Sequence, residues 1–162
     1  MQHQATIISF ANHKGGVGKT TTTASVGSIL ASLGKKILLV DMDAQSNLTS
    51  SLLKGEQVDR TIYDALTASC RGESYRLSIF PIAENLDISS LRLASADLEL
   101  ASVMAREHIL TDILQEKIAE YDYILIDCPP SLGLLTLNAV TASDLVVIPL
   151  LAEVLPFQGL TM

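Results

Sequence analysis

Short apolar segments alternate along this chain with segments whose apolar residues recur at helical spacing. The apolar segments are rich in β-branched residues and bounded by polar or glycine-containing turns, which predicts strands, the four most apolar of them buried. The six predicted strands are 5–10, 36–41, 77–82, 86–91, 123–127 and 145–150. Strands that alternate with helices form a mostly parallel sheet with helices on both faces, so the expected fold class is α/β.

The predicted helices differ in how clearly their apolar face can be recognised. Segment 20–33 carries Val26, Ile29, Leu30 and Leu33 at helical spacing, which predicts an amphipathic helix resting on these four side chains. Gly34 follows as a plausible C-cap. The remaining predicted helices are 61–66, 94–104, 107–119 and 132–142, and the polar segment 67–76 is expected to be a surface loop.

The most informative segment lies between the first predicted strand and the first predicted helix. Residues 14–21 read Lys-Gly-Gly-Val-Gly-Lys-Thr-Thr. Glycines at such a turn let the backbone N–H groups point at phosphate oxygens, and the start of the helix presents its positive dipole end to the same anion. Lys19 would contact the β- and γ-phosphates, and the Thr20 hydroxyl would ligate Mg²⁺.

The exact form of this loop is more specific than the general phosphate-binding pattern. The general pattern G-x-x-x-x-G-K-[ST] needs a glycine at position 13, where this chain has His13. The segment instead matches the deviant Walker A loop, which has a second lysine near its start, here Lys14. A glycine-rich turn with two incidental lysines is the competing interpretation, and it does not account for the strand, the loop and the helix together.

Acidic residues end two of the predicted buried strands. Asp41 and Asp43 follow the second strand, and Asp127 ends the strand 123–127. Buried carboxylates are costly unless they meet a metal, a cation or water, and ligand sites in open α/β sheets lie at this edge. Asp127 has the Walker B form, an apolar strand that delivers an acid to Mg²⁺. The neighbouring Cys128 is interpreted as a small apolar residue at a strand end.

Composition limits the remaining classes. The chain has 162 residues, of which 48% are hydrophobic and 18% charged, which predicts one globular domain spanning residues 1–162. No apolar run reaches the roughly 18–20 residues of a membrane span, and no signal peptide is recognisable. We therefore expect a cytoplasmic protein. The two cysteines, Cys70 and Cys128, agree with a reducing compartment. The net charge of −7, without a basic patch, argues mildly against tight DNA binding by this segment.

Three signatures in this order resemble the ParA/Soj family of chromosome- and plasmid-partitioning ATPases. They are the lysine-led loop 14–21, the Asp-x-Asp-x-Gln string 41–45 and the segment 124–130 with its Asp-x-Pro-Pro ending. The resemblance covers nearly the whole chain, and segment 131–139 favours the ParA branch over MinD-type ATPases and nitrogenase iron protein. One departure is Ala44, which stands where the family usually has proline.

The resemblance implies a role for each matching residue. Lys14 would reach the phosphates of a facing subunit, and Asp43 would position the attacking water. Asp41 and Asp127 would support Mg²⁺ through water. The implied ATP/ADP-binding residues are Lys14, Gly15, Gly16, Val17, Gly18, Lys19, Thr20 and Thr21.

The resemblance also implies an ATP-dependent homodimer, a ParB-like centromere-binding partner, non-specific contact with DNA in the nucleoid, and no membrane partner. Family members extend well past residue 162, so we expect the DNA-binding residues, and a C-terminal portion of the domain, to lie beyond this segment. The alternatives are a MinD-like division-site ATPase, a small-molecule ligase of the dethiobiotin-synthetase kind, and a nucleotide-binding module that does not hydrolyse ATP. The sequence shows no obvious substrate pocket for a ligase.

Overall fold

The structure is a computed structural model that describes residues 4–53, 62, 68, 73, 77–90 and 107–152. The predicted helix 94–104 lies outside the described residues, as do most of the predicted helix 61–66 and most of the predicted loop 67–76. Ile62 and Ala68 are both helical. Ala68 therefore departs from the loop predicted for its segment.

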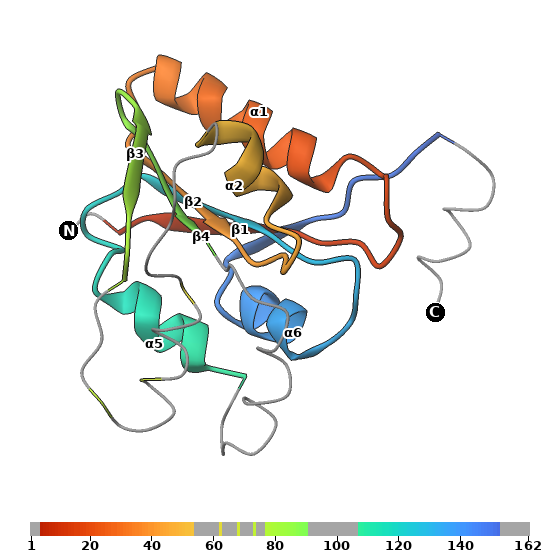
Figure 1. Ribbon diagram of the computed structural model, residues 1–162. Helices are drawn as coiled ribbons and strands as arrows, with labels where there is room; N and C mark the ends of the chain where they lie inside the picture. The colour runs from red at the N-terminus through yellow and green to blue at the C-terminus, as the bar shows by residue number, and fades with distance from the viewer. Residues whose placement is uncertain are drawn as a thin grey trace.

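The described part of the chain forms one sheet with helices on both faces (Figure 1). Its strands are β1 (Thr6–Phe10), β2 (Ile37–Asp41), β3 (Phe80–Ala83), β4 (Leu86–Ser90), β5 (Tyr123–Asp127) and β6 (Leu145–Val147). Its helices are α1 (Lys19–Ser32), α2 (Asn47–Leu52), α5 (Ile109–Gln115) and α6 (Leu134–Thr141). Every strand lies within or one residue beyond a predicted segment, and α1, α5 and α6 confirm three predicted helices. The short helix α2 was not predicted.

The strand order is β3-β4-β2-β5-β1-β6. All neighbours are parallel except β3 and β4, which form an antiparallel hairpin around Glu84 and Asn85. Asn85 has a φ of 60°, the left-handed conformation that asparagine tolerates better than most residues. The mostly parallel α/β sheet predicted from the sequence is confirmed.

Two hydrophobic cores cover the two faces of the sheet. Helices α1 and α2 lie on one face, and α5 and α6 lie on the other (Figure 1). Successive residues of a strand point to opposite faces, so Leu39 and Leu125 pack towards α1, whereas Leu38 and Ile124 pack towards α5 and α6. Strands buried on both faces read as continuous apolar runs, which explains why these segments were recognisable in the sequence.

The apolar face predicted for the first helix is half right: Val26 and Leu30 are half-buried and pack against the core on the α1 face of the sheet, whereas Ile29 and Leu33 point to solvent. Ile29 and Leu33 are 59% and 71% exposed, while the residues of α1 that face the sheet are small: Thr23, Gly27 and Ala31. A Cβ atom added to Gly27 would lie only 2.7 Å from the Leu39 Cδ2 atom. The helix lies close to β2 because glycine leaves room there, so the fully buried positions facing the sheet hold small residues, and Val26 and Leu30 pack beside them.

The burial predicted for the last strand is wrong. Strand β6 pairs with β1 on one side, and the other side of β6 is an edge of the described sheet. Leu145, Val146 and Val147 are all exposed. An apolar run indicates a strand suited to burial, but only the strand order shows whether a neighbour covers it. Among the described residues, no helix has both the length and the apolarity needed to cross a membrane.

Candidate functional site

The strand register brings the predicted acids together at one edge of the sheet. Asp41 is aligned with Asp127 on the neighbouring strand, and Asp127 is aligned with Phe10, the last residue of β1. On the other side, Asp41 is aligned with Ser90 at the end of β4. The loop 14–21 begins just after Phe10, so the loop and both acids share the carboxyl edge of the sheet, where α/β proteins bind their ligands.

The loop has the backbone that its glycines allow. Gly16 and Gly18 have φ angles of 73° and 88°, a region that other residues adopt at a cost. No atom lies within 4 Å of a Cβ atom added to Gly15 or Gly16, so both face open space. Val17 is buried and anchors the loop. Helix α1 then begins at Lys19, which places its unpaired N–H groups next to the loop.

Lys19 lies inside the loop. Its side chain is only 7% exposed, and its Nζ atom donates to the Lys14 carbonyl over 3.4 Å. A buried lysine is rare unless an acceptor or an anion compensates its charge. One long hydrogen bond to a carbonyl is weak compensation, and the nearby Asp127 carboxylate is not bonded to the lysine, so this ammonium group is suited to an incoming anion.

Asn12 supports the entrance of the loop, and the sequence analysis missed it. Its Oδ1 atom accepts a hydrogen bond from the Lys14 backbone N–H over 2.9 Å, and its Nδ2 atom donates to the Pro149 carbonyl over 2.9 Å. The side chain thus ties the start of the loop to the segment after β6. An asparagine two residues before a loop lysine fits the side-chain-to-backbone turn that asparagine favours, and this was the available signal.

We expect Asn12→Ala to weaken Mg²⁺-nucleotide binding by up to about thirtyfold, because two hydrogen bonds of about 1 kcal/mol each that preorganise the loop are lost. The measurement is calorimetric titration of the variant with nucleotide. His13→Ala is the matched control, because His13 is an exposed neighbour on the same loop. A similar loss in both variants would contradict a specific role for Asn12.

Asp127 is buried without a partner. Its side chain is 0% exposed, and neither carboxylate oxygen accepts a hydrogen bond from the described residues. Burial, together with the charges of Asp41 and Asp43, raises the pKa of Asp127 to about 7, although nearby Thr20 and Lys19 oppose the rise. Thr20 is therefore close to this carboxylate without forming a regular hydrogen bond to it. A buried, unpaired acid at a ligand-binding edge is suited to a cation.

Asp41 differs from Asp127 because its carboxylate is well bonded. Its Oδ1 atom accepts from the Asp43 N–H, and its Oδ2 atom accepts from both the N–H and the hydroxyl of Thr49. Burial still raises the pKa of Asp41, although the bonds from Thr49 and Asp43 oppose the rise and the Asp43 charge adds to it. These bonds leave one lone pair of Oδ1 for a further donor.

Asp43 lies at the start of the turn that leads to α2. Its Oδ1 atom accepts from the Gln45 N–H over 3.0 Å, and its carbonyl accepts from the Ser46 N–H. The side chain is 9% exposed, so it is almost buried at the same edge. Ser46 has a φ of 49°, a left-handed conformation that turns the chain into α2.

These residues fit Mg²⁺ held together with a nucleotide. The described residues contain no group of three or more histidine, cysteine or acidic side chains that would bind a metal alone. Mg²⁺ bound with nucleotide commonly needs only one or two carboxylates, because phosphate oxygens and water complete its shell. The unpartnered Asp127 carboxylate near Thr20 meets this requirement.

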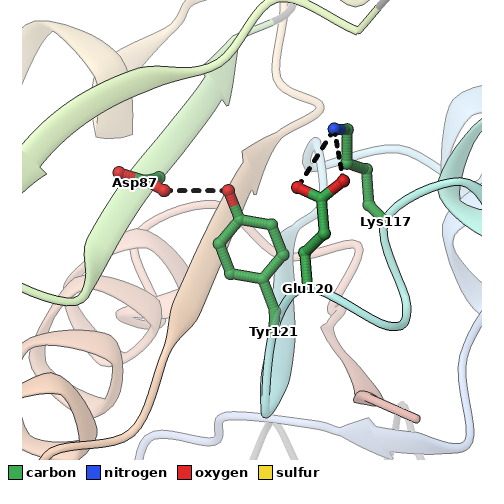
Figure 2. A network of polar contacts seen from close by, with 4 residues as sticks. All are labelled: Asp87, Lys117, Glu120 and Tyr121. Carbon is green, nitrogen blue, oxygen red and sulfur yellow. Dashed lines mark hydrogen bonds and ion pairs between the residues drawn. The ribbon is translucent and has the colours of Figure 1, made fainter. Parts of the chain in front are cut away.

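A polar cleft lies at the opposite edge of the sheet, near the amino ends of β2, β4 and β5. It has a volume of about 430 Å³, and Lys36, Asp87, Glu120 and Tyr121 are among its lining residues. Figure 2 shows that the two carboxylates lining it are already engaged: the Tyr121 hydroxyl donates to Asp87 over 2.8 Å, and Lys117 pairs with Glu120. Burial and this bond raise the pKa of Tyr121. The contacts are those of a network that supports the fold.

The parallel sheet, the glycine loop leading into α1 and the two acids on adjacent strands define a nucleotide-binding protein of the P-loop class. A family model described as an AAA domain matches residues 5–162. The chain is 46% identical over 158 residues to the sporulation initiation inhibitor protein Soj of Bacillus subtilis. It is also 46% identical over 166 residues to the chromosome partitioning protein ParA of Myxococcus xanthus. The chain belongs to this AAA-domain family and, within it, to the ParA/Soj group.

The alignments cover 96% of this chain but 62% of Soj and 55% of ParA, so the chain spans less than two thirds of these relatives. Solved structures agree on the fold. A plasmid partition protein from Borrelia burgdorferi bound to AMPPNP matches with a TM-score of 0.81 at 31% identity, over 98% of this chain and 68% of that one. Cobyrinic acid a,c-diamide synthase from Mycobacterium smegmatis, with a bound ATP analogue and magnesium, matches with a TM-score of 0.83 at 34% identity, over 97% and 66%.

Proposed function

We propose that this chain is the nucleotide-binding region of a Mg²⁺-dependent ATPase that acts as a dimerisation switch in the partitioning of plasmid or chromosomal DNA. The observation that carries the proposal is the buried Lys19 in an open glycine loop, at the same sheet edge as the unpartnered Asp127 carboxylate. A cationic loop and a buried acid together suit a magnesium-bound polyphosphate. An ATPase of this kind could serve several processes, and we choose DNA partitioning because the chain is similar to the ParA and Soj relatives.

In this proposal the loop binds ATP or ADP through residues 14–21. Lys19 neutralises the β- and γ-phosphates, the backbone N–H groups at the start of α1 bind phosphate oxygens, and Thr21 lies near the α-phosphate. Thr20 would ligate Mg²⁺, and Asp127 and Asp41 would support the metal through water, Asp41 with the lone pair that its other bonds leave. The metal supplies charge neutralisation between the phosphates. Asp43 orients the attacking water, which is a positioning role.

Lys14 has a different assignment. Its N–H is held by Asn12 at the loop entrance, and its carbonyl accepts from Lys19, so the backbone of Lys14 is fixed on both sides. We assign its side chain to the phosphates of a nucleotide bound by a second subunit. Each lysine of a two-fold dimer then completes the other site, and dimerisation depends on ATP. The ParB-like partner, the DNA contact through regions beyond residue 162 and the cytoplasmic, nucleoid-associated location belong to the same proposal.

A small-molecule ligase is the second candidate, because cobyrinic acid a,c-diamide synthase is as similar in structure as the partition protein. The two functions differ in what ATP does. A partitioning switch associates with itself when it binds ATP, whereas a ligase consumes ATP only to activate a second substrate. ATP-dependent self-association therefore separates them.

The test is analytical ultracentrifugation of the full-length protein with Mg²⁺ and a non-hydrolysable ATP analogue. We expect the wild type to dimerise and Lys14→Ala to remain monomeric. Asp43→Ala should dimerise normally, but in an assay with ATP it should hydrolyse the nucleotide at least tenfold more slowly, because a water-positioning group acts mainly in the transition state. Lys117→Ala is the control, since this lysine lies at the opposite edge and pairs with Glu120. Dimerisation of Lys14→Ala at the wild-type level would contradict the switch.

A further inference from the structure

A buried hydrogen-bonded chain joins three separate elements beside the site. Thr49 of α2 donates to Asp41 at the end of β2, with 2.6 Å between the Thr49 Oγ1 and Asp41 Oδ2 atoms. The Thr49 hydroxyl is also 2.7 Å from the Ser90 hydroxyl at the end of β4. Asp41 and Ser90 are 0% exposed, and Thr49 is 5% exposed.

The direction of these bonds follows from the number of protons. An ionised carboxylate only accepts, and a threonine hydroxyl has one proton to donate. Thr49 therefore donates to Asp41, and Ser90 donates to Thr49. The Thr49 N–H adds a second bond to the same Asp41 oxygen over 2.9 Å. Bonds to a charged acceptor inside a protein are stronger than neutral ones, so Asp41 holds the start of α2 firmly.

The other oxygen of Asp41 holds the backbone of Asp43. The Asp43 N–H donates to Asp41 Oδ1 over 3.1 Å, so one carboxylate fixes both ends of the turn between β2 and α2. The left-handed Ser46 lies within this turn, and such a conformation persists only where the surroundings hold it. The position of Asp43 thus depends on Asp41, and the orientation of Asp41 depends on Thr49.

We infer that Thr49 is a positioning residue for ATP hydrolysis: its hydroxyl, braced by Ser90, orients Asp41 and thereby sets where Asp43 presents its carboxylate to the attacking water. The inference rests on the proposed ATPase function. Thr49 touches neither nucleotide nor metal in this role, and Asp41 reaches the metal only through water, so the loss of the hydroxyl should change turnover far more than nucleotide binding.

The test compares Thr49→Val, which keeps the shape and the N–H but removes the hydroxyl, with Thr49→Ser, which keeps the hydroxyl. In the full-length protein we expect Thr49→Val to lower kcat about tenfold with KM for ATP within about threefold of wild type. Thr49→Ser should retain most of the activity, and Ser90→Ala should cause a smaller loss than Thr49→Val. Unchanged kcat in Thr49→Val, or an equal loss in Thr49→Ser, would overturn the inference.

A double-mutant cycle distinguishes action through Asp43 from a general loss of stability. If Thr49 acts through Asp43, Thr49→Val has little further effect on kcat in the Asp43→Ala background, whereas full additivity contradicts the inference. Amide hydrogen exchange gives a readout independent of hydrolysis. We expect faster exchange at Asp43, Gln45 and Ser46 in Thr49→Val. Unchanged exchange at these residues would refute the role of the Thr49 hydroxyl in holding the turn. A wild type without ATPase activity would instead refute the proposed function, and the exchange result would still decide the role of Thr49.

Discussion

Lys19→Ala is expected to lower the affinity for Mg²⁺-nucleotide by a factor of 100 or more, about 3 kcal/mol, because a buried cation at the phosphates is lost. Lys19 is 7% exposed, and among the described residues its ammonium group has one hydrogen bond, a long one to a loop carbonyl, with the Asp127 charge nearby but not bonded to it. The measurement is isothermal titration calorimetry, with thermal melting of each variant to confirm that it is folded.

Two further variants separate charge from packing. Lys19→Met keeps most of the buried aliphatic stem and removes only the charge, so it should bind as weakly as Lys19→Ala. Lys35→Ala removes an exposed lysine beyond the end of α1 and should bind like the wild type. Equal affinities of wild type and Lys19→Met would refute the assignment of residues 14–21 to phosphate binding.

Asp127→Asn is expected to stabilise the nucleotide-free chain at pH 8. Burial raises the pKa of Asp127 to about 7, well above the value near 3.8 of an unfolded chain. Between these values the folded protein holds a proton that the unfolded protein has lost, so the free energy of unfolding falls as the pH rises from about 4 to about 7. Above pH 7 the folded chain carries an unpaired buried charge, and asparagine removes it.

The expected gain at pH 8 is on the order of 3 kcal/mol, or a rise in melting temperature of roughly 5 °C or more for a domain of this size. Near pH 4 the variant and the wild type should melt almost alike, because Asp127 is then protonated in the folded chain and still about half protonated in the unfolded chain. Glu84→Gln, at the exposed hairpin turn, is the control and should show no such pH dependence. A difference between Asp127→Asn and wild type that is equal at pH 4 and pH 8 would contradict the buried, unpaired carboxylate.

The same substitution should reverse its effect when Mg²⁺ and nucleotide are present. The metal would compensate the Asp127 charge in the wild type, so ligand should stabilise the wild type more than the variant. This reversal would link the destabilising effect of the Asp127 carboxylate in the absence of ligand to a role of that carboxylate in binding Mg²⁺ and nucleotide. If the reversal is observed, Asp127 destabilises the protein without ligand and contributes to binding, a common pattern at functional sites.

Local chemistry in the sequence was sufficient to predict the loop. Glycines that adopt positive φ, a lysine at the start of a helix and a β-branched strand before it are requirements that act within a few residues. The structure shows the corresponding features in Gly16, Gly18 and Lys19. The strands were predictable for the same reason, since a parallel strand buried on both faces needs an unbroken apolar run.

The sequence alone therefore determined the α/β class, most of the strands and the phosphate-type loop of this protein. Tertiary structure decided which strands are neighbours, and hence that Asp41 lies beside Asp127 and that β6 is an edge. It also decided that α1 faces the sheet through Gly27 rather than Ile29, and that Thr49 bonds Asp41 and Ser90. These outcomes depend on contacts between residues far apart in the chain, whereas periodicity and turn chemistry report only what a residue and its near neighbours require.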